Sequence, residues 1–262
     1  MVEDAFVENV MALYRGPAGV LYELLMTEHI HPGGVEDTKV LAEKAGIRKG
    51  LKVLDVGSAL GGPARYLARK YGCSVTGLDA TDSMLEEASR RNRAAGLEDL
   101  IELKLGNALD MPFEDGTFDI VWGQDAWCYI SDKERLINEC ARVIKPQGIL
   151  AFTDWLETEI FDPMEKEMVL AMLVMPNLQT FSGYLTLLKE NGFQILEQED
   201  LNDDFVSHTR DYQTQMEGDL KAQIIEKFGE DLYPGAKAAI DMLASAVQGS
   251  KMSRGRFIAR KI

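Results

Sequence analysis

Short apolar runs alternate with helical segments along the chain from residue 49 onward. The apolar runs read "LKVLDVG", "SVTGLDA", "IELKLGN", "FDIVWGQ" and "GILAFTDW". Between them, segments 62–71, 82–95 and 132–144 show the helical spacing of apolar residues. Strands that alternate with helices are typical of a parallel sheet covered by helices on both faces. The pattern therefore predicts an α/β fold with a Rossmann-like core.

The last third of the chain follows a different order of elements. A Met-rich helical stretch at 163–175 precedes a helix that Gly192 caps at its C-terminus, and a strand at 193–199 follows. A polar, mostly helical insertion at about 202–248 separates this strand from a last strand that begins near Arg254. No crossover orders these two strands in parallel, so we expect an antiparallel pair at one edge of the sheet.

The first 48 residues are helical in pieces, because turn signals at "RGPAG" and "HIHPGG" interrupt the helical pattern. We expect these helices and the late insertion to shape a binding site beside the core. On these patterns the chain divides into an N-terminal helical cap at 1–48, the core at 49–201, a helical lid insertion at 202–248 and the last core strand at 249–262.

The net charge of the chain limits the classes of partner that it can bind. The 43 acidic and 28 basic side chains give a net charge of −15. An acidic surface repels phosphate backbones and anionic lipids, so we expect neither a nucleic acid nor a membrane as a partner. No apolar stretch approaches the roughly 18 residues of a membrane span, and the N-terminus lacks the features of a signal peptide. We therefore expect a cytoplasmic protein, and a homo-oligomer is compatible with this composition.

The turn after the first strand, "VLDVGSALGG", is a partial dinucleotide-binding fingerprint. Ligands of open α/β sheets bind at the carboxyl ends of the strands. The second glycine of G-x-G-x-x-G lets the backbone approach a pyrophosphate, and Ala59 takes its place here. Asp55, just before the turn, would repel a pyrophosphate but attract an ammonium group. Asp79, at the end of the second strand, can accept hydrogen bonds from both hydroxyls of a ribose.

S-adenosylmethionine suits this pair of acids better than NAD does, because it has a ribose and an amino-acid end but no phosphate. The alternative is that Asp55 only caps the next helix, since aspartate is a good helix cap, and that Gly61 and Gly62 only allow close packing. Asp55 precedes the turn rather than the helix itself, which favours the interpretation as a ligand contact.

Four segments together resemble the successive motifs of the class I S-adenosylmethionine-dependent methyltransferases: "VLDVGSALGG", "GLDA", "GNALDMPFEDGTFDIVWGQDAW" and "ARVIKPQGILAFTDW". The resemblance covers roughly residues 50–156 and implies a seven-stranded sheet whose last strand is antiparallel. Within that superfamily, "HIHPGG", "GQDAWCY" and "NECARVIKPQG" are most similar to the small-molecule N-methyltransferases of phosphoethanolamine and of sarcosine or dimethylglycine.

The resemblance implies where the cofactor would lie. Asn107 stands where the family usually has aspartate, and its amide can still offer an oxygen to the adenine amino group. The implied contacts are Asp55, Gly57, Ser58 and Gly61 around the methionine part, Asp79 and Ala80 at the ribose and adenine, Asn107 and Ala108 at the adenine edge, Gln124 and Asp125 below the sulfonium, and Ile30 and His31 closing the site.

The resemblance also implies catalytic residues. Tyr14 matches the tyrosine of the catalytic latch of phosphoethanolamine methyltransferases, whereas Tyr129 stands where those enzymes have histidine. A phenol with a pKa near 10 is a poor base at pH 7, so we expect Tyr129 to orient the acceptor. The predicted catalytic residues are Tyr14, Asp125 and Tyr129, and the predicted acceptor contacts are Tyr22, His29, Trp127 and Trp155.

Two further features bear on the ligands. His29 and His31 have no third ligand nearby in the sequence, and the three cysteines form no CxxC pair, so no metal is expected. Residues 168–178, "MVLAMLVMPNL", lack any charged or aromatic side chain, which disfavours phosphoethanolamine as the substrate. This stretch is either a buried helix or subunit contact, or an adaptable apolar wall of the pocket.

These observations lead to one main hypothesis and several alternatives. The main hypothesis is methyl transfer from S-adenosylmethionine to the nitrogen of a small amine or amino acid, with a sarcosine- or dimethylglycine-like acceptor. The first alternative is methylation of carbon, oxygen or sulfur in a larger apolar metabolite. The others are a catalytically silent S-adenosylmethionine binder and a NAD dehydrogenase.

Overall fold

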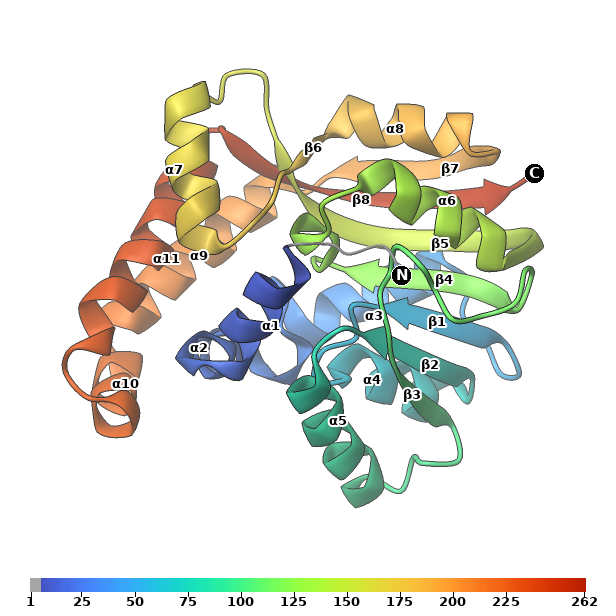
Figure 1. The fold of residues 1–262 in the computed structure, drawn as a ribbon, viewed down its shortest axis with the longest axis horizontal. Helices are drawn as coiled ribbons and strands as arrows, with labels where there is room; N and C mark the ends of the chain where they lie inside the picture. Colours follow the sequence, from blue (N-terminus) through green and yellow to red (C-terminus); the bar gives the residue numbers. More distant parts are fainter. Residues whose placement is uncertain (1–5) are drawn as a thin grey trace.

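The computed structural model describes residues 6–262, which form one twisted sheet with helices on both faces (Figure 1). The strand order is β3-β2-β1-β4-β5-β8-β7, and the two-residue strand β6 pairs with β5 outside this path. Only β8 runs antiparallel to its neighbours, which are β5 and β7. The predicted Rossmann-like fold with an antiparallel last strand is therefore confirmed. The strands are β1 Lys52–Val56, β2 Ser74–Asp79, β3 Ile101–Leu105, β4 Phe118–Gln124, β5 Ile144–Glu157, β6 Gln179–Thr180, β7 Phe193–Asp200 and β8 Met252–Lys261.

The helices follow local start and stop signals of the sequence. Helix α4 has proline in its first turn and ends at Gly72 in the left-handed conformation, and the side chains of Asp132 and Asp162 cap α6 and α7. The helices are α1 Val7–Arg15, α2 Pro17–Met26, α3 Gly34–Lys44, α4 Gly62–Tyr71, α5 Asp82–Ala94, α6 Lys133–Val143, α7 Pro163–Leu173, α8 Phe181–Glu190, α9 Asn202–Glu217, α10 Asp219–Phe228 and α11 Leu232–Gln248, with short 3-10 turns η1 Thr27–His29 and η2 Trp127–Tyr129.

Alternating strand residues feed two cores on opposite faces of the sheet. Val53 of β1 packs with Leu41 of α3 and Leu67 of α4, whereas the next residue, Leu54, packs with Leu136 of α6 on the other face. Because neighbouring strand residues point to opposite faces, one short apolar run serves both cores. The sheet edge that carries the carboxyl ends of the parallel strands stays free for a ligand.

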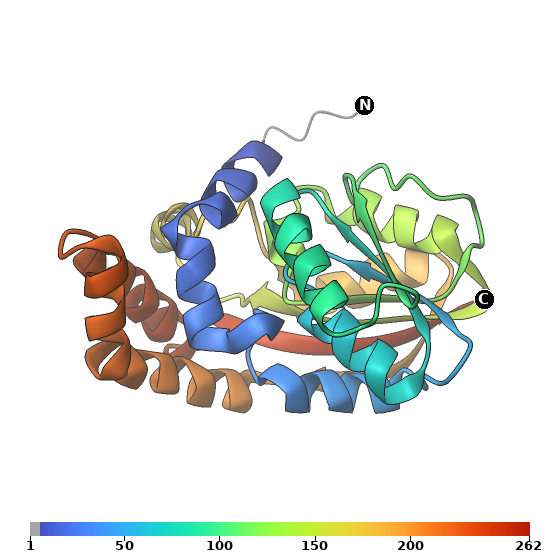
Figure 2. The ribbon, with the colours of Figure 1, turned by 90° about the horizontal axis from the view of Figure 1, so that it is seen from below.

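A third apolar cluster lies beyond this edge. It joins α2 of the N-terminal segment to α7, α9, α10 and α11, and includes Tyr22, Phe205 and Ile240 (Figure 2). Helices α9, α10 and α11 occupy the segment between β7 and β8. None of the helices in residues 6–262 is long and apolar enough to cross a membrane.

The Met-rich stretch does not form a wall of the main cavity. One side of α7 is buried through Val169 and Leu173, while Met164, Met168 and Met172 are 74%, 57% and 43% exposed. The exposed methionines lie four residues apart, on one stripe of the helix.

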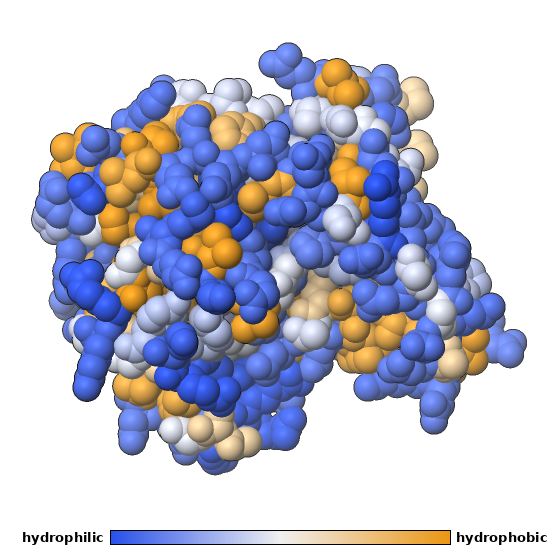
Figure 3. Space-filling model, turned by 180° about the vertical axis from the view of Figure 1, so that it is seen from behind, coloured by the Kyte–Doolittle hydropathy of each residue, from blue (hydrophilic) through white to orange (hydrophobic). Residues whose placement is uncertain are grey.

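The surface seen from behind is mostly hydrophilic, with apolar side chains in separate groups, as the acidic composition leads one to expect (Figure 3).

A buried ion cluster ties three elements together. Arg254 of β8 is 1% exposed and donates to both carboxylate oxygens of Asp125, after β4, at 2.8 and 2.7 Å. The same guanidinium donates to Asp37 of α3 at 2.5 Å. Burial alone would lower the pKa of Arg254, but the charges of Asp125 and Asp37 outweigh burial and raise it. The guanidinium is therefore charged, and it neutralises two carboxylates that have little other access to solvent.

We expect Arg254→Met to lower the free energy of unfolding by about 3–5 kcal/mol, because it leaves the buried carboxylate of Asp125 without its counter-ion, whereas Asp37 keeps Arg256. Urea denaturation followed by tryptophan fluorescence measures this change. The control is Arg260→Met on the same strand, where the side chain is exposed and the expected change is within about 0.5 kcal/mol. Equal stabilities of the two variants would show that the ion cluster does not hold the elements together.

Candidate active site

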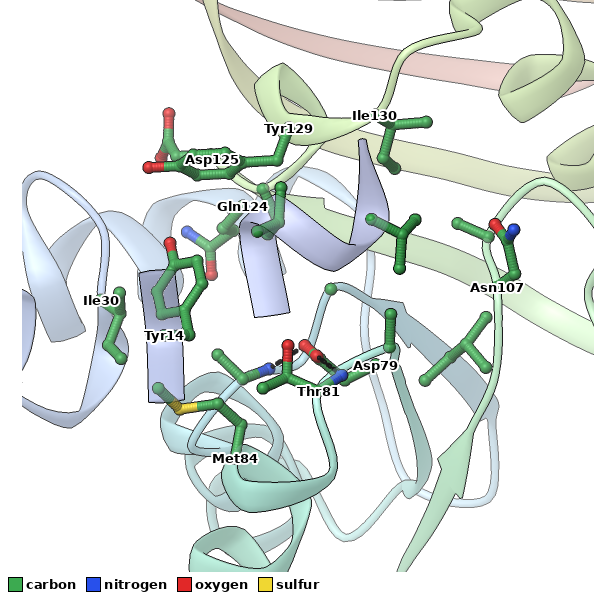
Figure 4. Close-up of a pocket in the computed structure, with 18 of the residues that line it drawn as sticks. Tyr14, Ile30, Asp79, Thr81, Met84, Asn107, Gln124, Asp125, Tyr129 and Ile130 are labelled. Atoms are coloured by element: carbon green, nitrogen blue, oxygen red, sulfur yellow. Dashed lines mark hydrogen bonds between the residues drawn. The ribbon is translucent and has the colours of Figure 1, made fainter. Parts of the chain in front are cut away.

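A cavity opens at the carboxyl ends of β1, β2 and β4, with an empty volume of about 860 Å³ including its mouth (Figure 4). Of the residues predicted from the sequence, the cavity is lined by Tyr14, His29, Ile30, Gly57, Asp79, Ala80, Asn107, Ala108, Gln124, Asp125 and Tyr129. The predicted residues that do not line it are Tyr22, His31, Asp55, Ser58, Gly61, Trp127 and Trp155.

Two backbone amides hold Asp79 at the end of β2. Its carboxylate accepts from the N–H of Ala59 in the glycine-rich turn and from the N–H of Thr81, both at 2.8 Å. Burial raises the pKa of Asp79, although these hydrogen bonds counteract the rise. The carboxylate thus stays in place at the cavity wall, where it can accept the hydroxyls of a ribose.

Asp55 is a buried carboxyl group with an unused oxygen. It is 2% exposed, and its Oδ2 accepts no hydrogen bond within residues 6–262. Burial, together with the charge of Asp79, raises its pKa to about 7. The alternative that Asp55 caps α4 is wrong, because Gly61 is the N-cap residue and no side chain caps that helix. A buried carboxyl oxygen without a partner is free to accept a hydrogen bond from a ligand, and an ammonium group is a donor of suitable charge.

Two glycines allow other parts of the chain to approach the turn. Gly57 has φ +82°, and a Cβ there would lie 2.5 Å from the Cβ of Ala126. A Cβ at Gly62 would lie 2.3 Å from the backbone oxygen of Glu28. Gly62 therefore allows the N-terminal segment, rather than a strand, to pack on α4. Ser58, by contrast, is 4% exposed and its hydroxyl is close to the Cβ position of Gly77, away from the cavity.

Thr38 connects the N-terminal segment to the end of β4. Its hydroxyl lies 3.0 Å from His29 Nδ1, from His31 Nε2 and from the side-chain oxygen of Gln124. Burial, together with the charge of His31, lowers the pKa of His29 to about 4, and burial also lowers the pKa of His31. Both imidazoles are therefore neutral at pH 7. They hold Ile30, which has φ 51°, over the cavity.

Three tyrosines meet at the acceptor side. The ring of Tyr14 lies 5.8 Å from that of Tyr22 and 5.7 Å from that of Tyr129, and the hydroxyl of Tyr129 donates to that of Tyr22 at 3.4 Å. Burial is the largest cause that raises the pKa of all three phenols. None of them can act as a base at neutral pH, so their rings and hydroxyls can only contact and orient a ligand.

Three predicted contacts have other roles in the structure. Trp127 is fully buried, stacks on Phe152 at 4.3 Å and donates its indole N–H to the backbone oxygen of Val56, so it is a core residue. Trp155 packs 5.1 Å from Phe205 in the third apolar cluster. The carboxylate of Asp125 faces Arg254, and with His31 and Asp37 it places ligand atoms within 4.8 Å of one another. Arg254 already supplies the positive charge there.

Several cavity residues escaped the sequence analysis. Ala59 and Thr81 belong to the loops that follow β1 and β2, and Met84 lies in the first turn of α5, so their place just after the strand ends was a usable signal. Val7 and Val10 come from a segment without a motif, whereas Ile130 directly follows the "GQDAWCY" segment. The remaining unpredicted lining residues are Leu78, Gly106 and Ala126.

Comparisons with known proteins agree with this site. The model of a family described as "Methyltransferase domain" matches residues 54–152. A sarcosine/dimethylglycine N-methyltransferase of Halorhodospira halochloris is 31% identical over 186 residues, which are 70% of this chain and 67% of that protein. A glycine/sarcosine/dimethylglycine N-methyltransferase of Actinopolyspora halophila is 37% identical over 163 residues, which cover 62% of this chain but only 29% of that longer protein.

A further relative is named for a different acceptor, and a solved structure is named for the same acceptors as the first two. A sterol 24-C-methyltransferase of Aspergillus fumigatus is 35% identical over 169 residues, which are 62% of this chain and 45% of that protein. Among solved structures, a candidate sarcosine dimethylglycine methyltransferase of Galdieria sulphuraria superimposes with a TM-score of 0.80 and 28% identity, covering 87% of this chain and 86% of the other.

The fold, the two carboxyl groups at the strand ends and these matches define a class of enzyme. The chain belongs to the S-adenosylmethionine-dependent methyltransferases. Its cofactor is S-adenosylmethionine, the methyl donor of this family, and membership of the family replaces the NAD dehydrogenase alternative. The unpartnered oxygen of Asp55 fits that cofactor on the evidence of this chain alone.

We expect Gly57→Ala to lower the free energy of unfolding by more than left-handed backbone strain alone would, because the new Cβ also meets Ala126. The control is Gly50→Ala, because Gly50 has φ +83° but open space around its Cβ position, so it should cost only the left-handed strain of about 1–2 kcal/mol. Gly57→Ala should add an overpacking cost of about 1–3 kcal/mol against Ala126 and weaken binding of S-adenosylhomocysteine. Urea denaturation and calorimetry measure both effects; equal costs would refute the steric argument.

We expect the affinity for S-adenosylhomocysteine to rise as the pH increases from 6 to 8, because Asp55, with a pKa of about 7, must lose its proton before it pairs with the ammonium. Calorimetry at several pH values measures this, and Asp55→Asn should weaken binding at pH 8 by about 100-fold and flatten the profile. The control is Glu102→Gln, an exposed acid on β3. A flat profile in the native protein would remove Asp55 from the site.

The carboxyl group of Asp55 also makes the stability of the ligand-free protein depend on pH, in the direction opposite to that of ligand affinity. The pKa of Asp55 is higher in the folded than in the unfolded chain, so the ligand-free protein binds more protons folded and loses stability as the pH rises from about 4 through 7. Asp55→Asn should therefore be more stable than the native protein at pH 8 without ligand, in a urea denaturation that uses the same Glu102→Gln control.

Proposed function

We propose that this enzyme transfers the methyl group of S-adenosylmethionine to the nitrogen of a small amine or amino acid. The names of the Halorhodospira, Actinopolyspora and Galdieria proteins support an acceptor of the sarcosine or dimethylglycine kind. The observation that carries the proposal is the group of Tyr14, Tyr22 and Tyr129 beside the cavity. Aromatic faces attract a methylated ammonium, which is the product of N-methylation.

We assign the cofactor contacts from the same geometry. Asp55 would hold the ammonium of the cofactor and Asp79 its ribose, while Ala80, Asn107 and Ala108 would meet the adenine. Gln124 would lie below the sulfonium, and Ile30, positioned by His31, would close the site. The oxygen of Asn107 already accepts from the backbone N–H of Leu109 at 2.8 Å, so its second lone pair would have to serve the adenine.

The chemistry asks mainly for alignment. When bound, the cofactor supplies a methyl group that its sulfonium has already activated for in-line displacement. The residues of this chain contribute by orienting the acceptor and by excluding water. Tyr14 and Tyr129 keep their protons at neutral pH because their pKa values are raised, and Arg254 neutralises Asp125. We therefore propose that the amine reacts as its free base, without a general base from the protein.

The helical segments beyond the sheet edge would enclose the acceptor. Helices α2 of the N-terminal segment and α9 to α11 of the late insertion pack on each other through the third apolar cluster. This cluster contains Tyr22 and surrounds the side of the tyrosines that faces away from the cavity. We propose that these segments act as cap and lid and exclude water during the transfer.

A second candidate function is methylation of carbon in a larger apolar metabolite. The sterol 24-C-methyltransferase relative supports it, and so do the apolar side chains of Val7, Val10, Met84 and Ile130 in the cavity wall. A carbon acceptor with an electron-rich double bond would attack the methyl group without first losing a proton, and the cation formed would lose its proton after the transfer. This candidate predicts turnover of an apolar alkene or alcohol in the absence of turnover of any amine.

We expect transfer of label from S-adenosylmethionine to at least one member of a panel of glycine, sarcosine, dimethylglycine, ethanolamine and other biogenic amines. A second panel contains phenols, enols, thiols and sterol-like alkenes. Scintillation counting and mass spectrometry of the product identify the methylated atom. Turnover in the second panel alone would overturn the proposed N-methylation.

Two variants of one tyrosine test the role of its ring. Tyr129→Phe keeps the aromatic face, so kcat/KM for the best amine should fall by less than about 10-fold, whereas Tyr129→Leu removes the face and should cost a further factor of about 5–30. Binding of S-adenosylhomocysteine to both variants is the control for the cofactor site. Equal activity of the two variants would show that the aromatic face does not matter.

A further inference from the structure

Four polar groups surround the hydroxyl of Thr38, which has only one proton to donate. Its neighbours are the backbone oxygen of Gly34 at 3.2 Å and, each at 3.0 Å, His29 Nδ1, His31 Nε2 and the side-chain amide of Gln124. A threonine hydroxyl donates one hydrogen bond and accepts two. The proton of Thr38 therefore goes to one neighbour, and the others either donate to its oxygen or make no hydrogen bond with it.

His31 is the neighbour that needs this proton. Its Nδ1 lies 2.9 Å from the backbone oxygen of Pro32, which can only accept, so Nδ1 carries a hydrogen. Burial and the neighbouring charge of Arg254 lower the pKa of His31 more than the nearby acids raise it, so the ring is neutral at pH 7. A neutral imidazole with its hydrogen on Nδ1 has a lone pair on Nε2. Because that lone pair faces the hydroxyl of Thr38, the hydroxyl donates to it.

The amide of Gln124 must then act as a donor to Thr38. In the structure its oxygen is the end next to the hydroxyl, and its nitrogen is buried without a hydrogen-bond partner among residues 6–262. With no proton left for that oxygen, two acceptors would face each other at 3.0 Å. The two ends of a carboxamide have nearly the same shape, so hydrogen bonding decides which end is nitrogen. The proton count therefore places the nitrogen next to Thr38 and leaves the oxygen as the end without a protein partner.

The register of the sheet places Gln124 beside the groups assigned to the cofactor. Asp55 of β1 lies opposite Gly77 of β2 and Trp122 of β4. Asp79 and Gln124 therefore lie two residues further toward the carboxyl ends, on the strands to either side of Asp55, and both line the cavity (Figure 4). The sulfonium of S-adenosylmethionine joins the ribose, assigned above to Asp79, to the amino-acid end, assigned to Asp55.

We infer that Gln124 turns its carbonyl oxygen, and not its amide nitrogen, toward the cofactor, where it distinguishes the positive sulfonium of S-adenosylmethionine from the neutral sulfur of S-adenosylhomocysteine. An amide oxygen attracts a cation and accepts weak hydrogen bonds from a polarised methyl group, whereas an amide nitrogen would repel both. The contact therefore holds the methyl donor more tightly than the product. The inference deepens the position below the sulfonium proposed for Gln124 and rests on that position, but not on the nature of the acceptor.

The tautomer of His31 is the first test, because it is measured without any ligand. Proton–nitrogen correlation spectra of the full chain at pH 7 show which ring nitrogen carries the hydrogen. The chain has three histidines, so the signals that disappear in His31→Gln identify those of His31. We expect a neutral ring with its hydrogen on Nδ1. A hydrogen on Nε2, alone or with one on Nδ1, would overturn the inference, because the proton of Thr38 would then be available to the oxygen of Gln124.

Binding of two ligands tests the contact itself. Calorimetry without an acceptor gives the affinities of the native chain for S-adenosylmethionine and for S-adenosylhomocysteine. Gln124→Met removes the amide and nearly keeps the volume of the side chain. We expect it to weaken binding of S-adenosylmethionine by about 5- to 10-fold more than binding of S-adenosylhomocysteine. An amide nitrogen facing the carboxylate of the cofactor would instead predict an equal loss for both ligands, which would refute the inference.

Variants of Thr38 test whether its hydroxyl sets the orientation of the amide. Thr38→Val keeps the shape but releases the amide, so the preference for S-adenosylmethionine over S-adenosylhomocysteine should fall by about 3- to 10-fold. Thr38→Ser restores the hydroxyl and should keep the native preference. The matched control is Thr209→Val in α9, where the threonine is equally buried and its hydroxyl donates to the backbone oxygen of Val206. Equal preferences in Thr38→Val and Thr38→Ser would contradict the role of the hydroxyl.

These outcomes are separate from those of the proposed function. If the ligand preference changes as expected while no amine is methylated, the inference stands and the proposed N-methylation is wrong. If Gln124→Met weakens both ligands equally, the inference is wrong and N-methylation is unaffected. If Thr38→Val does not fold, the tautomer of His31 and the Gln124→Met variant decide the question.

Discussion

One buried guanidinium, that of Arg254, links the N-terminal helix α3, the loop after β4 and the last strand β8 through its charge. Arg254 lies at the start of β8, and its two carboxylate partners belong to α3 and to the residue after β4. Asp37 also pairs with Arg256, which in turn pairs with Glu199 of β7. An ion that is removed from water requires a partner at every bonding position, so these elements can come together in only one arrangement.

The geometry of the site depends on this cluster. Asp125 has φ 53°, a left-handed conformation that is strained for a residue with a side chain, and its paired carboxylate holds it there. The chain turns at Asp125 into η2, which brings Tyr129 to the cavity beside Tyr14 of the N-terminal segment. The same charge pairing therefore holds Asp125 and η2 in place beside the cavity.

The two other acids at the strand ends, Asp79 and Asp55, differ in how their oxygens are bonded. Asp79 accepts from two backbone amides and needs no ligand to stay in place, whereas Asp55 has a buried oxygen without a partner. Around Tyr14 and Tyr129 the groups are aromatic or aliphatic, and both phenols stay protonated near neutral pH because burial raises their pKa values. Such a site favours a reaction in which the donor is already activated and the protein aligns two reactants and removes water.

The sequence by itself determined the sheet, the glycine-rich turn and the pair Asp55 and Asp79, because strand periodicity, capping and turn chemistry act between residues that are close along the chain. It did not determine which aromatic residues face the cavity. Trp127 follows β4, as Tyr129 does, and Trp155 lies near the end of β5, but their orientation was decided by packing against Phe152 and Phe205 from distant segments. Likewise, the pairing of Asp125 with Arg254 joins residues more than a hundred positions apart, and only the tertiary structure brings their charges together.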